Sequence, residues 1–255
     1  MTPKELVQKC ARCHSRRAML TDNFDYEDHF LDHYIPSLLT EPNYELDGQI
    51  KDEVYVYGSF KQSKMYKEGV SCNDCHNPHT LSLRKVGNDL CLNCHTPNYN
   101  DYSHHFHKSD SPAGQCINCH MTGKTYRGND YRRDHSFRVP RPDQTVDYGT
   151  PNACNNCHQD KTADWAAKFI IDKYGDIRPD HFSDEILAGY HGDLEAYYNV
   201  FSNNEYPEIV RATALNRYGN NVLIEEEFEK IFKYVNDLSP LVRKEAALSL
   251  SRRNN

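Results

Sequence analysis

Apolar side chains recur with a helical period in the last third of the chain. Apolar positions spaced i, i+3, i+4 and i+7 indicate a helix with one buried face. Here they are filled by Phe228, Ile231, Phe232 and Val235. The same amphipathic character extends back to Thr162. We therefore expect residues 161–255 to form a domain of packed helices.

This helical segment contains an internal similarity. Residues 207–211 align with residues 239–243. In this alignment the Val-Arg pair at 210–211 matches the Val-Arg pair at 242–243, so the repeat period is 32 residues. A proline-led helix start followed by such residues resembles a HEAT repeat, whose usual period is about 40 residues. The alternative is two unrelated amphipathic helices. Because repeat arrays need about three units and a cap, we expect the repeat domain to be truncated.

Aliphatic side chains are scarce in the middle of the chain. Only eight isoleucine, leucine and valine residues lie between Ser71 and His158, and turn formers such as Asn77-Pro78 interrupt the chain. Ordering a backbone costs about 1–2 kcal/mol of entropy per residue, so a segment this poor in apolar area needs staples, metals or a bulky cofactor to fold. We expect short helices and loops with little sheet. The predicted fold class is mainly α, with a loop-rich domain over residues 1–160 before the repeat domain.

Composition and charge exclude some partners. The apolar fraction is 38%, below the usual value of about 45–50%. The formal net charge of −7 argues against a nucleic-acid binder, which needs a basic surface. No stretch approaches the roughly 18 apolar residues of a membrane span, and residues 1–9 lack the apolar run of a secretory signal. We expect no nucleic-acid partner and no membrane span.

All ten cysteines fall in five copies of the pattern Cys-x-x-Cys-His. The cysteines are Cys10, Cys13, Cys72, Cys75, Cys91, Cys94, Cys116, Cys119, Cys154 and Cys157, and the histidines that follow them are His14, His76, His95, His120 and His158. Two cysteines at this spacing can form thioethers to the vinyl groups of one haem, and the next histidine then supplies an axial imidazole. The sequence therefore predicts five covalent haem c groups.

Two other interpretations of the cysteines are weaker. The pairs at 72–75 and 91–94 have the spacing of a zinc ribbon, and an even cysteine count also fits a disulfide framework. Neither explains why histidine follows every second cysteine. Five large, flat porphyrins would also replace the missing aliphatic core, and the eighteen tyrosines suit such an interior.

Nine histidines outside the motifs are available as second axial ligands. We predict this role for five of them: His29, His79, His105, His107 and His135. His79 follows a proline that restricts the turn, and His135 has a carboxylate neighbour that can fix its tautomer. Within residues 104–107 we prefer His105 and His107 over His104. His29 is chosen from a pair with His33 that shares a helix face.

The motifs resemble those of exported multihaem cytochromes that carry HEAT or tetratricopeptide repeats behind their haem region. The resemblance covers roughly residues 5–255 and rests on residues 72–79 (Cys-x-x-Cys-His-x-Pro-His), 104–107 (His-His-Phe-His), 119–121 (Cys-His-Met), 132–137 (Arg-Arg-Asp-His-Ser-Phe) and 151–154 (Pro-Asn-Ala-Cys). Residues 116–158 are also similar to ammonia-forming cytochrome c nitrite reductases. That similarity implies a related haem packing with His135 as a distal ligand.

The resemblance implies an electron carrier with five bis-histidine haems. Its partners would be redox proteins, either other cytochromes or a quinol-linked donor. Its location would be periplasmic or extracellular, and we expect this sequence to begin inside a longer exported precursor. An oligomer is a further expectation. The alternative is a multi-electron reductase of a small nitrogen or sulfur oxyanion at one open haem, although the chain has no Cys-x-x-Cys-Lys motif. A third class is a structural unit of a larger assembly.

Overall fold

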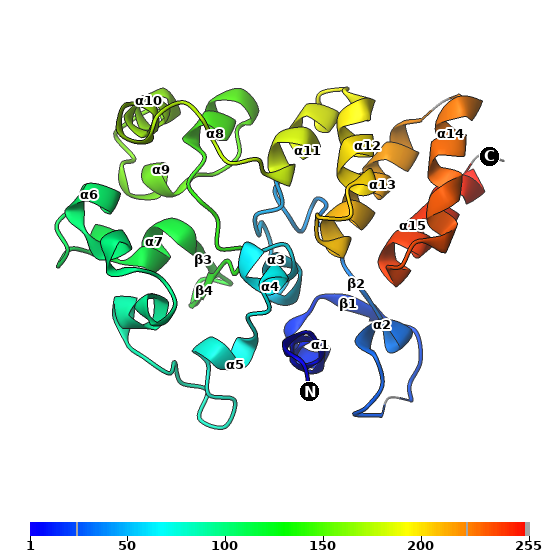
Figure 1. Ribbon diagram of the computed structural model, residues 1–255, viewed down its shortest axis with the longest axis horizontal. Coiled ribbons are helices and arrows are strands. Elements are labelled where there is room, and N and C mark those ends of the chain that lie inside the picture. The colour runs from blue at the N-terminus through cyan, green and yellow to red at the C-terminus, as the bar shows by residue number, and fades with distance from the viewer. Residues whose placement is uncertain (24, 223, 253–255) are drawn as a thin grey trace. The chain divides into compact units, whose positions relative to one another are not determined.

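Helices and loops make up most of the chain, which confirms the predicted mainly α class (Figure 1). The computed structural model describes residues 1–255 except 24, 223 and 253–255. Sheet in the described residues is confined to two antiparallel hairpins. They pair β1 (Arg17–Met19) with β2 (Tyr34–Pro36) and β3 (Gly123–Tyr126) with β4 (Asp130–Arg133). None of the described helices is long and apolar enough to cross a membrane.

The chain divides into two compact units. One comprises residues 1–10 and 63–177, and we call it the motif unit; the other comprises residues 11–62 and 178–255, and we call it the helical unit. This division differs from the expected boundary at residue 160. Residues 161–177 belong with the motifs, whereas residues 11–62 belong with the C-terminal helices.

The helical unit is built on a series of helices that pack in sequence. Its helices are α2 (Phe30–His33), α3 (Tyr57–Lys61), α11 (Phe182–Tyr190), α12 (Leu194–Ser202), α13 (Glu208–Asn221), α14 (Glu225–Phe232), η4 (Lys233–Asn236) and α15 (Pro240–Ser251). Figure 1 shows α11 to α15 following one another from yellow to red. Their facing sides bury Leu187, Phe201, Ile209, Leu215 and Ile231 completely. This unit therefore has an apolar core of its own.

The two aligned stretches have matching environments. Val210 in α13 and Val242 in α15 are both buried. The two helices also approach closely, because a Cβ on Gly219 would overlap the Ser249 side chain. Equivalent positions of the 32-residue alignment are thus buried in the same core. The assignment of these helices to HEAT repeats stays a prediction.

A buried ion pair joins these helices. The Arg211 guanidinium donates to both carboxylate oxygens of Asp237, at 3.2 and 2.5 Å, and its Nε donates to the Phe201 carbonyl at 3.0 Å. Asp237 also accepts from the Ser239 backbone N–H at 2.9 Å, at the start of α15. The side chains of Arg211 and Asp237 are only 7% and 9% exposed. The pair is therefore taken out of water and held by several hydrogen bonds.

Residues 38–62 attach to the same helices through backbone groups. The Leu39 N–H donates to Thr213 Oγ1 at 3.1 Å, and the Arg217 guanidinium donates to the carbonyls of Leu39 and Leu46, each at 3.1 Å. Burial lowers the pKa of the Arg217 guanidinium. These contacts explain why this early segment belongs to the helical unit.

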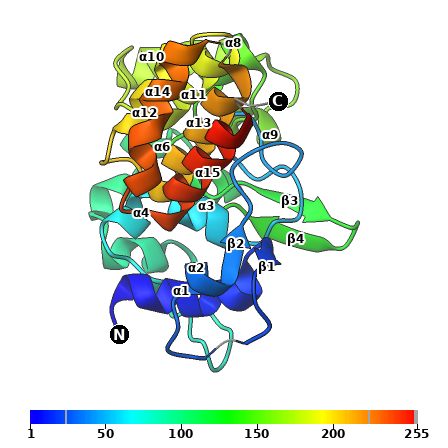
Figure 2. The ribbon, with the colours of Figure 1, turned by 90° about the vertical axis from the view of Figure 1, so that its right-hand side faces the viewer.

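The motif unit consists of short helical pieces. They are the start of α1 (Pro3–His14), α4 (Lys64–Lys67), α5 (Cys72–Cys75), η1 (Gly87–Asn93), η2 (Pro97–Asn100), α6 (Tyr102–His105), η3 (Pro112–Gly114), α7 (Cys116–His120), α8 (Pro142–Tyr148), α9 (Ala153–Cys157) and α10 (Ala163–Tyr174). The β3–β4 hairpin extends from the same unit (Figure 2).

This motif unit lacks an apolar core. Within residues 1–10 and 63–177, all of which the structure describes, the buried hydrophobic residues are Val7, Ala153 and Ala166. Larger apolar side chains are exposed instead, among them Leu81 at 85% and Val86 at 88%. A unit with so little buried apolar area fits the expectation that a bulky apolar cofactor completes it.

Candidate haem-attachment sites

Each Cys-x-x-Cys-His motif lies on or beside a helical turn. Cys10 and Cys13 lie in α1, and the later motifs lie on α5, at the end of η1, on α7 and on α9. Because residues three apart share a helix face, each turn presents its two thiols on one side. All ten cysteines lie within the described residues, and none of them is paired in a disulfide. The local geometry is therefore the one that two thioethers to a single porphyrin need.

Capping interactions hold two of these short turns. Asp74 accepts from the Ser71 backbone N–H at 2.7 Å and from its hydroxyl at 2.8 Å. At α9 the Asn152 side chain accepts from the Asn155 N–H at 3.0 Å. A cap of this kind stabilises a helix end by about 1 kcal/mol, which matters in a helix of one turn.

Thiols of different motifs interact with one another. A hydrogen bond from Cys72 lowers the pKa of the Cys10 thiol to about 7, and the same bond together with burial raises the pKa of Cys72. Burial, assisted by the neighbouring Cys116, raises the pKa of Cys91 to about 11. Burial likewise raises the pKa of Cys154 to about 11. Cys10 is thus the thiol of this group that ionises near neutral pH.

Three motif histidines each face another histidine. The ring centres of His76 and His135 are 6.4 Å apart with 25° between the planes. Those of His120 and His104 are 6.2 Å apart at 14°. Those of His158 and His107 are 6.0 Å apart at 37°.

These separations match two imidazoles on opposite sides of one metal ion. With metal–nitrogen bonds of about 2 Å and about 1.2 Å from that nitrogen to the ring centre, the two ring centres lie about 6.4 Å apart. The three pairs are within a few tenths of an ångström of that value. The residues present therefore fit haem iron held between two histidines.

Hydrogen bonds set the tautomers of three of these rings. Nδ1 of His120 donates to the Arg138 carbonyl at 2.8 Å, and Nδ1 of His135 donates to the Arg133 carbonyl at 3.0 Å. Nδ1 of His107 likewise donates to the carbonyl of His105. A carbonyl can only accept, so the proton is on Nδ1 and Nε2 keeps a lone pair for a metal.

Burial favours the neutral form of two of the facing rings. It lowers the pKa of His120 and, together with the nearby His120 ring, that of His104. A neutral imidazole is the form that binds a metal. Burial thus favours the metal-binding form of both rings of this pair.

The structure differs from the sequence prediction in residues 104–107. It places His104, rather than His105, opposite a motif histidine. Helix α6 ends at His105, and Phe106 takes a left-handed conformation with φ of 56°. This turn directs His107 to a different partner, His158. Phenylalanine seldom adopts such a backbone, so the sequence carried no signal for it.

The other predicted ligands have no facing histidine ring among the described residues. His79 is exposed, and its backbone N–H donates to Asn77 Oδ1 at 3.0 Å. His29 is exposed just before α2, and His14 is exposed at the end of α1. His95 contacts the ring edge of Tyr99, with centres 6.1 Å apart. The structure thus brings three of the five motif histidines into facing pairs.

Aromatic residues of α10 pack beside one of these pairs. The ring centres of Trp165 and His158 are 5.0 Å apart, and those of Phe169 and Phe106 are 5.7 Å apart. The Tyr174 hydroxyl donates to the His104 carbonyl. These contacts join α10 to the motifs and explain why residues 161–177 belong to the motif unit.

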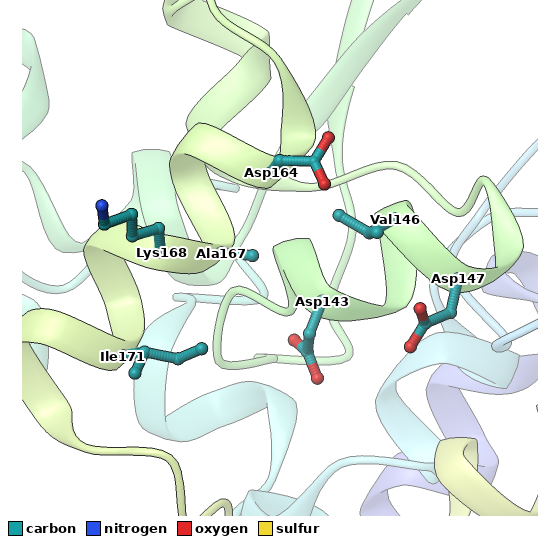
Figure 3. Close-up of a pocket in the computed structure, with 7 residues that line it drawn as sticks. All are labelled: Asp143, Val146, Asp147, Asp164, Ala167, Lys168 and Ile171. Carbon is teal, nitrogen blue, oxygen red and sulfur yellow. The ribbon is translucent and has the colours of Figure 1, made fainter.

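A shallow groove of about 290 Å³ runs between α8 and α10 on a different face of α10. Figure 3 shows the apolar side chains of Val146, Ala167 and Ile171 in it, with carboxylates at its rim. One of these, Asp143, is paired with the Arg141 guanidinium at 2.7 Å. None of the residues that line this groove is a histidine.

Comparison with known proteins identifies the motif pair in the middle of the chain. A family model described as "Doubled CXXCH motif" matches residues 64–100, which hold the second and third motifs. Cys-x-x-Cys-His is the attachment motif of c-type haem. The chain therefore carries the paired motifs of multihaem c-type cytochromes.

One solved structure also matches over most of the chain. It is the crystal structure of an outer cell wall cytochrome, OcwA, with 15% sequence identity and a TM-score of 0.48. The match covers 95% of this chain and 63% of that protein, so this chain spans less than two thirds of its length. No curated protein matches the sequence.

Proposed function

We propose that this chain transfers electrons through five covalently bound haems. The observation that carries the proposal is the set of three facing histidine pairs with ring centres 6.0–6.4 Å apart, each containing one motif histidine. When bound, haem c supplies one-electron chemistry at an iron whose potential the protein tunes.

The chain's own residues would anchor the five haems and supply the ligands of their irons. The ten cysteines form the thioethers, and the five motif histidines are the proximal ligands. We propose His135, His104 and His107 as second ligands opposite His76, His120 and His158. His29 and His79 remain the proposed second ligands of the other two irons. Two strong ligands on each iron would allow electron exchange without a change of ligands.

The proposal includes a location and a class of partner. We place the protein in the periplasm or outside the cell, because its motifs resemble those of exported multihaem cytochromes. Its partners would be redox proteins, either other cytochromes or a quinol-linked donor. The proposed assembly state is an oligomer.

A second candidate is a reductase of a small nitrogen or sulfur oxyanion. The observation that favours it is His95, whose ring meets Tyr99 and no histidine ring among the described residues. A tyrosine hydroxyl beside an iron with one open position is a potential proton donor. For this function, neither His79 nor His29 would bind the iron attached at His95, so that one ligand position of that iron would stay open to substrate.

We expect the haem-loaded protein to carry five haems and to contain only low-spin iron. Intact-mass measurement counts the covalent haems, and a low-temperature electron paramagnetic resonance spectrum reports the spin states. Adding nitrite should leave that spectrum unchanged. A high-spin signal from about one iron in five that shifts with nitrite would instead support the reductase, and a mass without covalent haem would overturn both candidates.

A further inference from the structure

His105 lies between two proposed iron ligands but is bonded differently from them. The backbone N–H of His107 donates to His105 Nδ1 at 3.2 Å. A ring nitrogen that accepts a hydrogen bond carries no proton, so the neutral His105 ring is protonated on Nε2. This is the opposite tautomer from that of His107, His120 and His135.

In this tautomer His105 has no nitrogen to offer a metal. Its Nδ1 lone pair is used by the His107 N–H, and its Nε2 holds the proton. Ligation through Nε2 would require a ring without any proton. The neighbouring His104 ring, which faces His120, takes the ligand position instead.

The Nε2–H of His105 is nevertheless buried and makes no hydrogen bond within the described chain. Buried donors are almost always paired, because an unpaired one forfeits its hydrogen bond to water. The acceptor must therefore come from outside the polypeptide. The proposed function brings one such group to this segment, since every haem carries carboxylates and His104 and His107 are proposed to hold two of the irons.

We propose that His105 is a positioning residue whose Nε2–H donates to a carboxylate of a bound haem. The inference rests on the proposed function and changes the role expected for His105 from ligand to hydrogen-bond donor. A charge-assisted bond to a carboxylate is among the stronger hydrogen bonds in proteins. It would fix the orientation of that haem and withdraw charge from its carboxylate.

The test compares His105→Leu, which removes the donor, with His105→Gln, which keeps an N–H. In the haem-loaded protein we expect every iron to stay low-spin in both variants. His105→Leu should shift the carboxylate-bending band in the resonance Raman spectrum and lower the reduction potential of one haem, because an unpaired carboxylate favours the ferric state. His105→Gln should stay closer to the unsubstituted protein. The exposed His191, replaced by leucine, is the matched control.

Two results would overturn the inference. A new high-spin signal in His105→Leu would make His105 an iron ligand. An unchanged Raman band and unchanged potentials would mean that the acceptor is only water. Both results presuppose covalent haem, which the intact mass establishes first. Failure of this inference is therefore distinguishable from failure of the proposed function.

Discussion

Replacing His104 with alanine is expected to convert one iron from low spin to high spin. Its ring centre is 6.2 Å from that of His120 and the two rings are nearly parallel, so its loss would leave the iron that His120 is proposed to hold with one histidine ligand. Electron paramagnetic resonance of the oxidised, haem-loaded protein measures the change. Added imidazole should enter the space left by the side chain and restore the low-spin signal.

A second substitution distinguishes the loss of an iron ligand from a general failure of the protein to assemble. His104→Met keeps a ligand of the methionine–histidine class, which raises the potential of a haem. We expect it to stay low-spin with one potential raised. His191→Ala, on an exposed residue of the helical unit, should change neither readout. An all-low-spin spectrum in His104→Ala without imidazole would remove His104 from the ligand set.

Replacing Asp237 with alanine is expected to destabilise the helical unit by about 3–5 kcal/mol. The change leaves the Arg211 guanidinium, only 7% exposed, without its carboxylate, and it also removes the acceptor for the Ser239 N–H. Urea unfolding of the haem-loaded protein, followed by far-ultraviolet circular dichroism, gives the free energy of unfolding.

Two comparisons identify the cause of that loss. Glu195→Ala breaks the exposed pair with Lys230, at 3.1 Å, and should cost less than about 1 kcal/mol. The double variant Asp237→Ala with Arg211→Met removes both charges and should be more stable than Asp237→Ala alone. If Asp237→Ala costs no more than Glu195→Ala, the buried pair is not a major stabilising contact.

The helical class could be predicted because its cause is local. The spacing of Phe228, Ile231 and Val235 indicated a helix, and the structure places Ile231 in the core. The shortage of aliphatic residues between Ser71 and His158 likewise anticipated a motif unit with almost no apolar core. Both inferences depend only on residue type and spacing.

The division of the chain could not be predicted in this way. Residues 38–62 join the helical unit through contacts such as Leu39 to Thr213, which are 174 positions apart. These bonds use backbone groups, which every residue possesses. No pattern in the sequence distinguishes such a segment from a loop of the first domain.

The choice among the clustered histidines likewise could not be made from sequence spacing. His104 and His105 are identical side chains on adjacent residues, and their roles diverge because the chain turns at Phe106. The hydrogen bond from His107 to His105 then fixes one tautomer. Spacing alone could predict that candidate ligands lie in this segment but not which ring lies opposite a motif histidine.

The contrast between the two units bears on how the protein is made. The helical unit can collapse around its own apolar side chains, because it buries residues such as Phe201 and Leu215 completely. The motif unit, with Val7, Ala153 and Ala166 as its buried apolar residues, has little to collapse around until porphyrins are attached. Its maturation would then be a single process in which each attachment step supplies the next part of the interior. A partly loaded chain would therefore remain open to proteases in this unit.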